Sequence, residues 1–244
     1  SKLEMDIEIP VVADAGDFIN AVKEIKTIPS LNLKKWQSIC NDWKLRYAIN
    51  DGKPFPQKGL ISHYHLANAL SENIPKNILI STGSSGLAVE AFYTAFRNKS
   101  GQRVFLTSGL GAMGYGLPSA IGACFANNKK SMVAIESDGS LQLNIQELAT
   151  VKAFNLPIII VIMNNDGYAS IRNTQRNYFK ERYVGTGPES GLVLPDLEKV
   201  AATYNIQFER IDDASDLNIK LNKYMTSKSP VLIDVRLIKN EVLL

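Results

Sequence analysis

The chain has 244 residues, of which 45% are hydrophobic, and its 27 Lys and Arg residues nearly balance 24 Asp and Glu residues. This length and composition exclude a disordered tail and suit one large α/β domain with a small appendage. Charges of both signs are interspersed without a long basic run, which argues against a nucleic-acid-binding or membrane-surface protein.

Cysteine usage and the apolar segments point to a cellular compartment. Only Cys40 and Cys124 are present, far apart and outside any Cys-x-x-Cys pair, which argues against a disulfide framework or a zinc ribbon. No apolar run approaches the roughly 20 residues of a membrane span, and the first residues lack the apolar core of a signal peptide. We therefore expect a cytoplasmic protein without a membrane partner.

The first sixty residues are less regular than the rest. We expect a short strand at residues 7–12, a helix at 17–25 and an amphipathic helix at 36–47. The turn formers and prolines of residues 51–56 cannot continue a helix. This region therefore predicts a linker or the tail of a neighbouring domain.

From Gly59 onward, helical periodicity alternates with short apolar runs. Residues 157–163 are apolar throughout, which is typical of a strand buried on both faces of a parallel sheet. The expected strands are 77–81, 103–107, 132–136, 157–163, 206–210 and 231–235, and the helices between them are 62–70, 87–96, 117–125, 141–154, 195–204 and 216–225. This pattern predicts an α/β fold with a doubly wound, mainly parallel six-stranded sheet and helices on both faces. In such folds the ligand lies at the carboxyl ends of the strands.

Two glycine-rich segments follow predicted strands. Thr82-Gly83-Ser84-Ser85-Gly86 offers amides and hydroxyls that could line a phosphate. Residues 109–114 spell a GxGxxG sequence before a helix, and Glu136 follows 22 residues after its last glycine, near where dinucleotide folds place a ribose-binding carboxylate. An NAD- or FAD-binding domain of an oxidoreductase is therefore an alternative, although it gives no role to the residues considered next.

Asp138 and Asn165 each follow a predicted strand. They lie 27 residues apart, the length of a turn, a helix, a second turn and a strand, so both fall at the same edge of the sheet. A carboxylate, an amide oxygen and a backbone carbonyl at the tight turn of Gly167 are the hard oxygen ligands that Mg²⁺ prefers. Gly139 and Ser140 begin the next helix, whose free amides and dipole attract a diphosphate. The sequence thus predicts one site for a metal and a diphosphate.

These residues resemble the fingerprint of the thiamine-diphosphate-dependent enzymes, Gly-Asp-Gly followed at about this distance by Asn-Asn. Residues 108–118 look like the corresponding stretch of the acetolactate synthase group. The resemblance covers the chain from about Gly59 to its end and implies that residues 59–244 are the C-terminal, diphosphate-binding domain. It also implies that residues 27–58 are an interdomain linker and that residues 1–26 are the tail of a preceding middle domain.

The resemblance implies a role for individual residues. The Mg²⁺ ligands would be the Asp138 carboxylate, the Asn165 side chain and the Gly167 carbonyl. The diphosphate contacts would come from Gly139, Ser140 and the loop at Ser84 and Ser85, with Tyr168 nearby. The Gly111 carbonyl would accept a hydrogen bond from the 4′-amino group of the cofactor. Met113 would hold the cofactor in the bent shape that brings this amine to its reactive carbon.

Several positions depart from the family pattern. Ser137 replaces the first glycine of the fingerprint, and Gly83-Ser84-Ser85 is closer to the decarboxylases than to the Gly-Gln-His of acetolactate synthases. Ile171 stands where decarboxylases have a glutamate, and Thr174 stands where acetolactate synthases have a tryptophan near the acceptor pocket. Decarboxylation and carboligation therefore both stay open. Residues 168–179 look most like acetolactate-synthase-like proteins of carbohydrate pathways, which implies a sugar nucleotide acceptor.

The implied activity is that of a carboligase or decarboxylase of a 2-keto acid, with pyruvate the expected substrate, in a homo-oligomer; an FAD requirement is left open. In the family, the activating glutamate comes from an N-terminal pyrimidine-binding domain of the parent chain or of a partner subunit. Because no second α/β unit is found here, we expect the 244 residues alone to be inactive. The other alternative is a cofactor-binding module that has lost catalysis, for which Ser137 is the only indication.

Two further pairs of residues were weighed for function. Arg172 and Arg176 are spaced to share a helix face, which is expected to be solvated or, alternatively, to hold a substrate carboxylate or phosphate. His63 and His65 are expected to pack or hydrogen-bond locally, because a spacing of two suits no helical metal pair.

Overall fold

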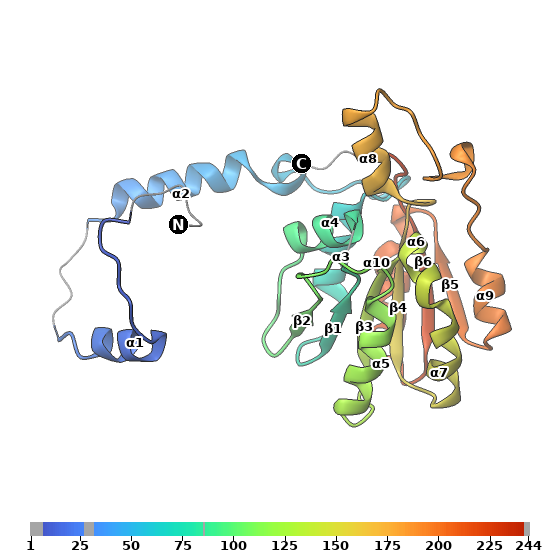
Figure 1. Cartoon of the computed structure of the whole chain (residues 1–244), viewed down its shortest axis with the longest axis horizontal. Coiled ribbons are helices and arrows are strands. Elements are labelled where there is room, and N and C mark those ends of the chain that lie inside the picture. The colour runs from blue at the N-terminus through green and yellow to red at the C-terminus, as the bar shows by residue number, and fades with distance from the viewer. Residues whose placement is uncertain (1–6, 27–31, 85, 242–244) are drawn as a thin grey trace. The chain divides into compact units, whose positions relative to one another are not determined.

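The computed structural model describes residues 7–26, 32–84 and 86–241, and its contacts divide the chain into two units, Ser1–Asp51 and Gly52–Leu244 (Figure 1). In the first unit, α1 (Ala15–Lys23) begins after Asp14, whose side chain accepts from the Gly16 amide at 2.8 Å. The other helix is α2 (Lys34–Arg46), and a short 3₁₀ turn, η1 (Ile49–Gly52), follows it.

The strand expected at residues 7–12 is wrong. These residues are exposed and form no strand, because a strand without a partner leaves its backbone groups unpaired.

The second unit is built on one six-stranded sheet. Its strand order is β2-β1-β3-β4-β6-β5, and every neighbouring pair is parallel. The strands are β1 (Leu79–Thr82), β2 (Arg103–Phe105), β3 (Met132–Ser137), β4 (Ile158–Asn164), β5 (Gln207–Ile211) and β6 (Val231–Arg236). The predicted α/β class is confirmed, and the sheet is wholly parallel.

Helices cover both faces of this sheet (Figure 1). They are α3 (His63–Asn73), α4 (Leu87–Ala95), α5 (Gly116–Ala126), α6 (Asp138–Leu141), α7 (Leu148–Ala153), α8 (Ala169–Tyr178), α9 (Leu197–Thr203) and α10 (Ala214–Tyr224), with 3₁₀ turns η2 (Gln142–Glu147) and η3 (Pro188–Ser190). One cluster joins α5, α7 and α9 to Ala134 of β3 and Ile160 of β4, while α3 packs on α4 and α10. All seven residues of β4 are buried, as expected for a strand covered on both faces. Within the described ranges, no helix is both long and apolar enough to cross a bilayer.

The long helix expected at residues 141–154 is wrong in its form. Helical structure already begins at Asp138, and it is broken into α6, η2 and α7 at Asn144, whose φ is −139°. The cause lies in the loop before α5. The Asn144 side-chain Nδ2 donates to the Gly114 carbonyl at 2.9 Å, and the Gly114 backbone amide donates to Ser140 Oγ at 2.7 Å. These side-chain bonds to a neighbouring loop compete with the regular helical pattern.

The segments before α3 and after β6 are joined. Ile61 and Leu237 form a parallel bridge, and the Ile238 amide donates to the Ile61 carbonyl at 2.9 Å. Next to this bridge, Ser62 caps α3, its Oγ accepting from the His65 amide at 2.9 Å. The start of α3 is therefore held at the carboxyl edge of the sheet, beside the ends of β4 and β6.

Candidate functional site

The polar residues predicted from the sequence meet where β3 and β4 end. The two strands are paired in register with Ser137 opposite Met163, so the residues that follow them lie side by side. Asp138 is 2% exposed, and its Oδ2 accepts from the Gly167 amide at 2.7 Å. Asn165 is 3% exposed at the same edge. The structure therefore brings together the three residues that were predicted as metal ligands.

The Asp138 carboxylate has an unused oxygen. Its Oδ1 is buried and has no hydrogen-bond partner among the residues that the structure describes. Burial raises the pKa of this carboxyl to about 6, although hydrogen bonds from the Gly167 and Gly139 amides act in the opposite direction. A buried carboxylate oxygen without a donor is costly unless a cation completes it. Within residues 7–26, 32–84 and 86–241, Asn165 Oδ1 accepts one long bond, from Arg172 Nη2 at 3.3 Å, which leaves a lone pair for a ligand. The donor set of carboxylate, amide oxygen and carbonyl fits a magnesium ion.

A cavity of about 160 Å³ lies beside these residues. Five residues that were predicted from the sequence line it: Met113, Ser140, Asn165, Gly167 and Tyr168. Ile171, one of the departures from the family pattern, lines it too. The cavity is thus formed by the ends of β3 and β4, the start of α8 and the GxGxxG loop.

The other predicted cofactor residues lie around this cavity. Ser84 Oγ accepts from the Thr107 amide at 3.0 Å, and a Cβ built on Gly111 would lie 3.5 Å from the Ser84 carbonyl oxygen, so the two glycine-rich loops are neighbours. Gly111 has a φ of +59°, in the left-handed region. Ser85 lies outside the described residues.

Gly139 is in contact with Tyr168. A Cβ built on Gly139 would lie 2.5 Å from Tyr168 Cε1, closer than real contacts allow. We expect Gly139→Ala to displace this ring and to destabilise the fold by roughly 1–3 kcal/mol. Gly122→Ala is the matched control, because a Cβ there meets nothing and an exposed helical alanine should add about 1 kcal/mol. Urea unfolding of both variants measures the difference, and equal stabilities would contradict this packing.

Glu136 has a structural role. It is 1% exposed, and its carboxylate accepts from the Gly116 amide at 2.8 Å and from the Ser137 amide at 3.2 Å. The first bond caps the start of α5. Burial raises the pKa of this carboxyl. A carboxylate enclosed in this way does not face a ribose, so the observation that favoured a dinucleotide site is accounted for by packing.

Arg172 is neither on a solvated face nor free for a substrate. It is 7% exposed, and its guanidinium donates to backbone carbonyls of three segments, at Asn165 (2.8 Å), Thr186 (2.5 Å) and Lys239 (2.7 Å). Arg176, one turn later in α8, donates to Asn173. Sequence periodicity could not reveal these bonds, because it does not show which loops cover a side chain of the helix.

The sequence also gave no sign of the contacts of His63. Its Nδ1 lies 2.6 Å from Glu241 Oε2, and its Nε2 lies 3.3 Å from Asn165 Nδ2. His65, in contrast, stacks on Phe55. The expectation of local packing is therefore wrong for His63, which contacts two distant segments.

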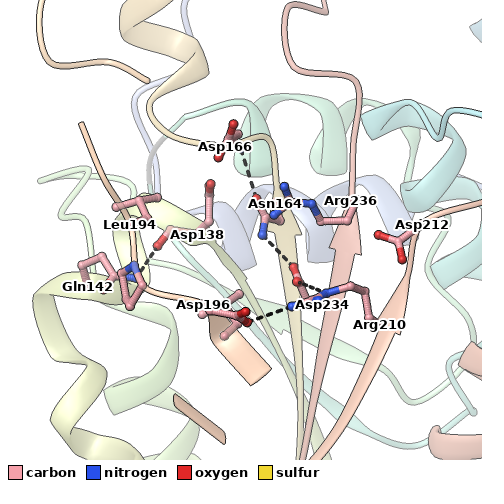
Figure 2. Close-up of a pocket in the computed structure, with 12 residues that line it drawn as sticks. Asp138, Gln142, Asn164, Asp166, Leu194, Asp196, Arg210, Asp212, Asp234 and Arg236 are labelled. Carbon is pink, nitrogen blue, oxygen red and sulfur yellow. Dashed lines mark hydrogen bonds and ion pairs between the residues drawn. The ribbon is translucent and has the colours of Figure 1, made fainter. Parts of the chain in front are cut away.

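A second cavity, of about 450 Å³, lies at the carboxyl ends of β4, β6 and β5, and Asp138 is among the residues that line it (Figure 2). Arg210 lines this cavity and pairs with Asp196 and Asp234. Asp234 also accepts a hydrogen bond from Asn164 Nδ2 at 2.7 Å. In the part of the chain that the structure describes, no three His, Cys, Asp or Glu side chains converge to hold a metal. Asp196 and Asp234 are therefore already paired with Arg210, and Asp234 also with Asn164.

Comparison with known proteins agrees with this geometry. Residues 81–235 match the family model described as "Thiamine pyrophosphate enzyme, C-terminal TPP binding domain". The chain belongs to this family. The match contains both strands that end at the site and all three residues predicted as metal ligands.

Relatives of this thiamine-diphosphate-binding domain include acetolactate synthase large subunits. That of Porphyra purpurea is 29% identical over 96% of this chain and 39% of its own length, and that of Parasynechococcus marenigrum is 31% identical over 96% and 37%. The chain therefore spans less than two-fifths of these relatives. A solved structure, the Rhodococcus jostii RHA1 thiamine diphosphate-dependent 4-hydroxybenzoylformate decarboxylase, has a TM-score of 0.61 at 20% identity, over 73% of this chain and 33% of that one. It shares the fold.

Proposed function

We propose that this domain binds thiamine diphosphate through a Mg²⁺ ion held by the Asp138 carboxylate, the Asn165 side chain and the Gly167 carbonyl. The observation that carries the proposal is the buried Asp138 Oδ1, which has no partner although the opposite oxygen is bonded to Gly167. Ser84, Ser85, Gly139 and Ser140 would face the diphosphate.

The bound cofactor would supply the nucleophilic carbon that attacks a 2-keto acid and takes up the electrons released with CO₂. The residues of this chain orient it. Gly111 is assigned to accept from the 4′-amino group, and Met113, which lines the cavity and is 39% exposed, is assigned to support the bend between the two rings. Tyr168 closes the cavity over Gly139.

The substrate of the parent enzyme is proposed to be a 2-keto acid, with pyruvate first. Ile171 lines the cavity at the position where decarboxylases of the family have a glutamate, and Thr174 replaces the tryptophan of acetolactate synthases. Because threonine is smaller than the tryptophan it replaces, a larger acceptor would have room there, and we propose a sugar nucleotide. Residues 168–179 support this through their likeness to proteins of carbohydrate pathways.

Cofactor binding is tested by thermal unfolding with thiamine diphosphate plus Mg²⁺, with thiamine diphosphate plus EDTA, and with NAD. We expect a rise in the unfolding midpoint of roughly 5–10 °C at a hundredfold excess over Kd, only with cofactor and metal together. Stabilisation by NAD alone would overturn the proposal. The NAD arm serves as the control for general ligand effects.

We further propose that the activating glutamate comes from a pyrimidine-binding domain outside these 244 residues, in a homo-oligomer in the cytoplasm. The length of the relatives supports the first point, and the unpaired Cys40 and Cys124 suit a reducing compartment. The chain alone is then expected to release no CO₂ from pyruvate, although it binds the cofactor. Turnover by the purified chain, measured as CO₂ release, would show that the activating group lies within it.

A further inference from the structure

Two segments from opposite ends of the second unit meet at Asn165. His63 is the first residue of α3, and Glu241 lies just after β6. The Ile61–Leu237 bridge sets these two segments side by side. The Leu237 amide also donates to the Asn164 carbonyl at 2.7 Å, which ties both segments to the end of β4.

The Glu241 carboxylate fixes the proton on the His63 ring. Its Oε2 lies 2.6 Å from the His63 backbone nitrogen and 2.6 Å from the ring Nδ1. A carboxylate only accepts, so Nδ1 carries a hydrogen, and Nε2, which lies against the NH₂ group of Asn165, is the acceptor of that second pair. The His63 side chain is 1% exposed, and the ring is held in this orientation by the packing around it.

The bare Nε2 fixes the orientation of the Asn165 amide. An acceptor at 3.3 Å requires the NH₂ group of Asn165, while the Arg172 guanidinium, which only donates, lies 3.3 Å from the other end of the same amide. Both neighbours therefore select the same orientation. Oδ1 stays available for the metal, whereas a flipped amide would present hydrogens to it.

We propose that His63 and Glu241 are positioning residues, which hold the Asn165 amide in the orientation that binds Mg²⁺. The inference rests on the proposed function for the identity of the metal. The hydrogen-bonded chain itself does not depend on any ligand, because every bond in it joins residues of this chain.

The first experiment reads the tautomer without cofactor. The protein has only two histidines, so selective ¹⁵N-histidine labelling gives two ring systems in a long-range ¹H–¹⁵N spectrum, assigned with His65→Gln. We expect His63 to show a protonated Nδ1 and a bare Nε2. In Glu241→Gln, which lacks a pure acceptor, this preference should weaken. A His63 ring protonated on Nε2 in the unmodified protein would overturn the inference.

The second experiment measures the Mg²⁺ concentration that gives half-maximal binding of thiamine diphosphate, by calorimetry. His63→Asn keeps a donor where Nδ1 was, but its side chain cannot reach Asn165. This variant should need roughly 10- to 100-fold more Mg²⁺, which is the usual loss when a residue that orients a metal ligand is removed. His63→Gln places an acceptor near the position of Nε2 and should recover most of this affinity. The control is His65→Gln, at the other buried histidine, with no change expected.

The outcomes separate the two proposals. Mg²⁺ dependence in His63→Asn equal to the unmodified protein, in a variant that circular dichroism shows to be folded, would overturn the positioning role while leaving the proposed function intact. If the unmodified protein binds no thiamine diphosphate with Mg²⁺, the proposed function fails and the role in metal binding fails with it, even where the ¹⁵N spectrum shows the expected tautomer.

Discussion

Asp138→Asn is expected to abolish Mg²⁺-dependent binding of thiamine diphosphate and, at neutral pH, to make the ligand-free protein more stable. The amide carries no negative charge to balance the cation at the position of Oδ1, so affinity should fall by more than about 100-fold. The same change removes a buried charge whose Oδ1 has no partner, and the gain should be roughly 1–3 kcal/mol.

The stability gained by Asp138→Asn should increase as the pH rises. Burial raises the pKa of Asp138 from 3.8 to about 6, so between these values the folded state binds more protons than the unfolded state. The Asp138 carboxyl therefore makes the unmodified protein lose stability as pH rises through this window, and the variant lacks this contribution. The difference between them should be small below pH 3.8 and complete above pH 6. Urea unfolding at a series of pH values without cofactor measures it.

Asp212→Asn is the matched control for this change. Asp212 lines the second cavity and is exposed, and no hydrogen bond or ion pair is found for it in the described ranges of the chain. It should change neither cofactor affinity nor, by more than about 0.5 kcal/mol, the stability of the ligand-free protein at neutral pH. If Asp138→Asn binds cofactor and Mg²⁺ as the unmodified protein does, Asp138 is not a metal ligand.

Arg172→Ala should produce the largest loss of stability, roughly 3–5 kcal/mol. Truncation leaves the carbonyls of Asn165, Thr186 and Lys239 without their shared donor in a buried place. Urea unfolding should show a lower midpoint, and the free energy of unfolding should fall by this amount. Arg172→Lys should recover little, because one ammonium group cannot span carbonyls of three segments in the way that a guanidinium does.

Arg176→Ala provides the comparison on the same helix. Arg176 is only half-buried and bonds to Asn173 on its own helix, so its removal should change stability by no more than about 0.5 kcal/mol. Equal losses for the two arginines would contradict the role given to the bonds of Arg172. A loss for Arg172→Ala that is reversed by cofactor plus Mg²⁺ would show that the ligand holds the same segments together.

The parts of the fold that could be predicted are those with a local signal. The apolar run that forms β4 and the spacing of Asp138 from Asn165 are properties of neighbouring residues, and a parallel sheet leaves few ways to arrange them. Gly167 was predicted from its turn.

What could not be predicted depends on contacts between distant segments. The break at Asn144 is caused by the loop at Gly114, and the burial of Arg172 depends on carbonyls at Thr186 and Lys239. The same holds for His63, whose partner Glu241 is 178 residues away. A helical period shows which face of a helix is apolar, but it does not show which loop covers a polar group on that face.

The bridge between Ile61 and Leu237 has a consequence for dissecting the protein. The matched family segment ends at residue 235, whereas Lys239 and Glu241, which contact Arg172 and His63, follow it. A version of the domain trimmed at the end of its sheet would keep Asp138, Asn165 and Gly167, the residues proposed to bind the metal. It would lose the Lys239 carbonyl and the Glu241 carboxylate, so the role proposed for Glu241 predicts that such a version binds Mg²⁺ less tightly even though its proposed ligands are all present.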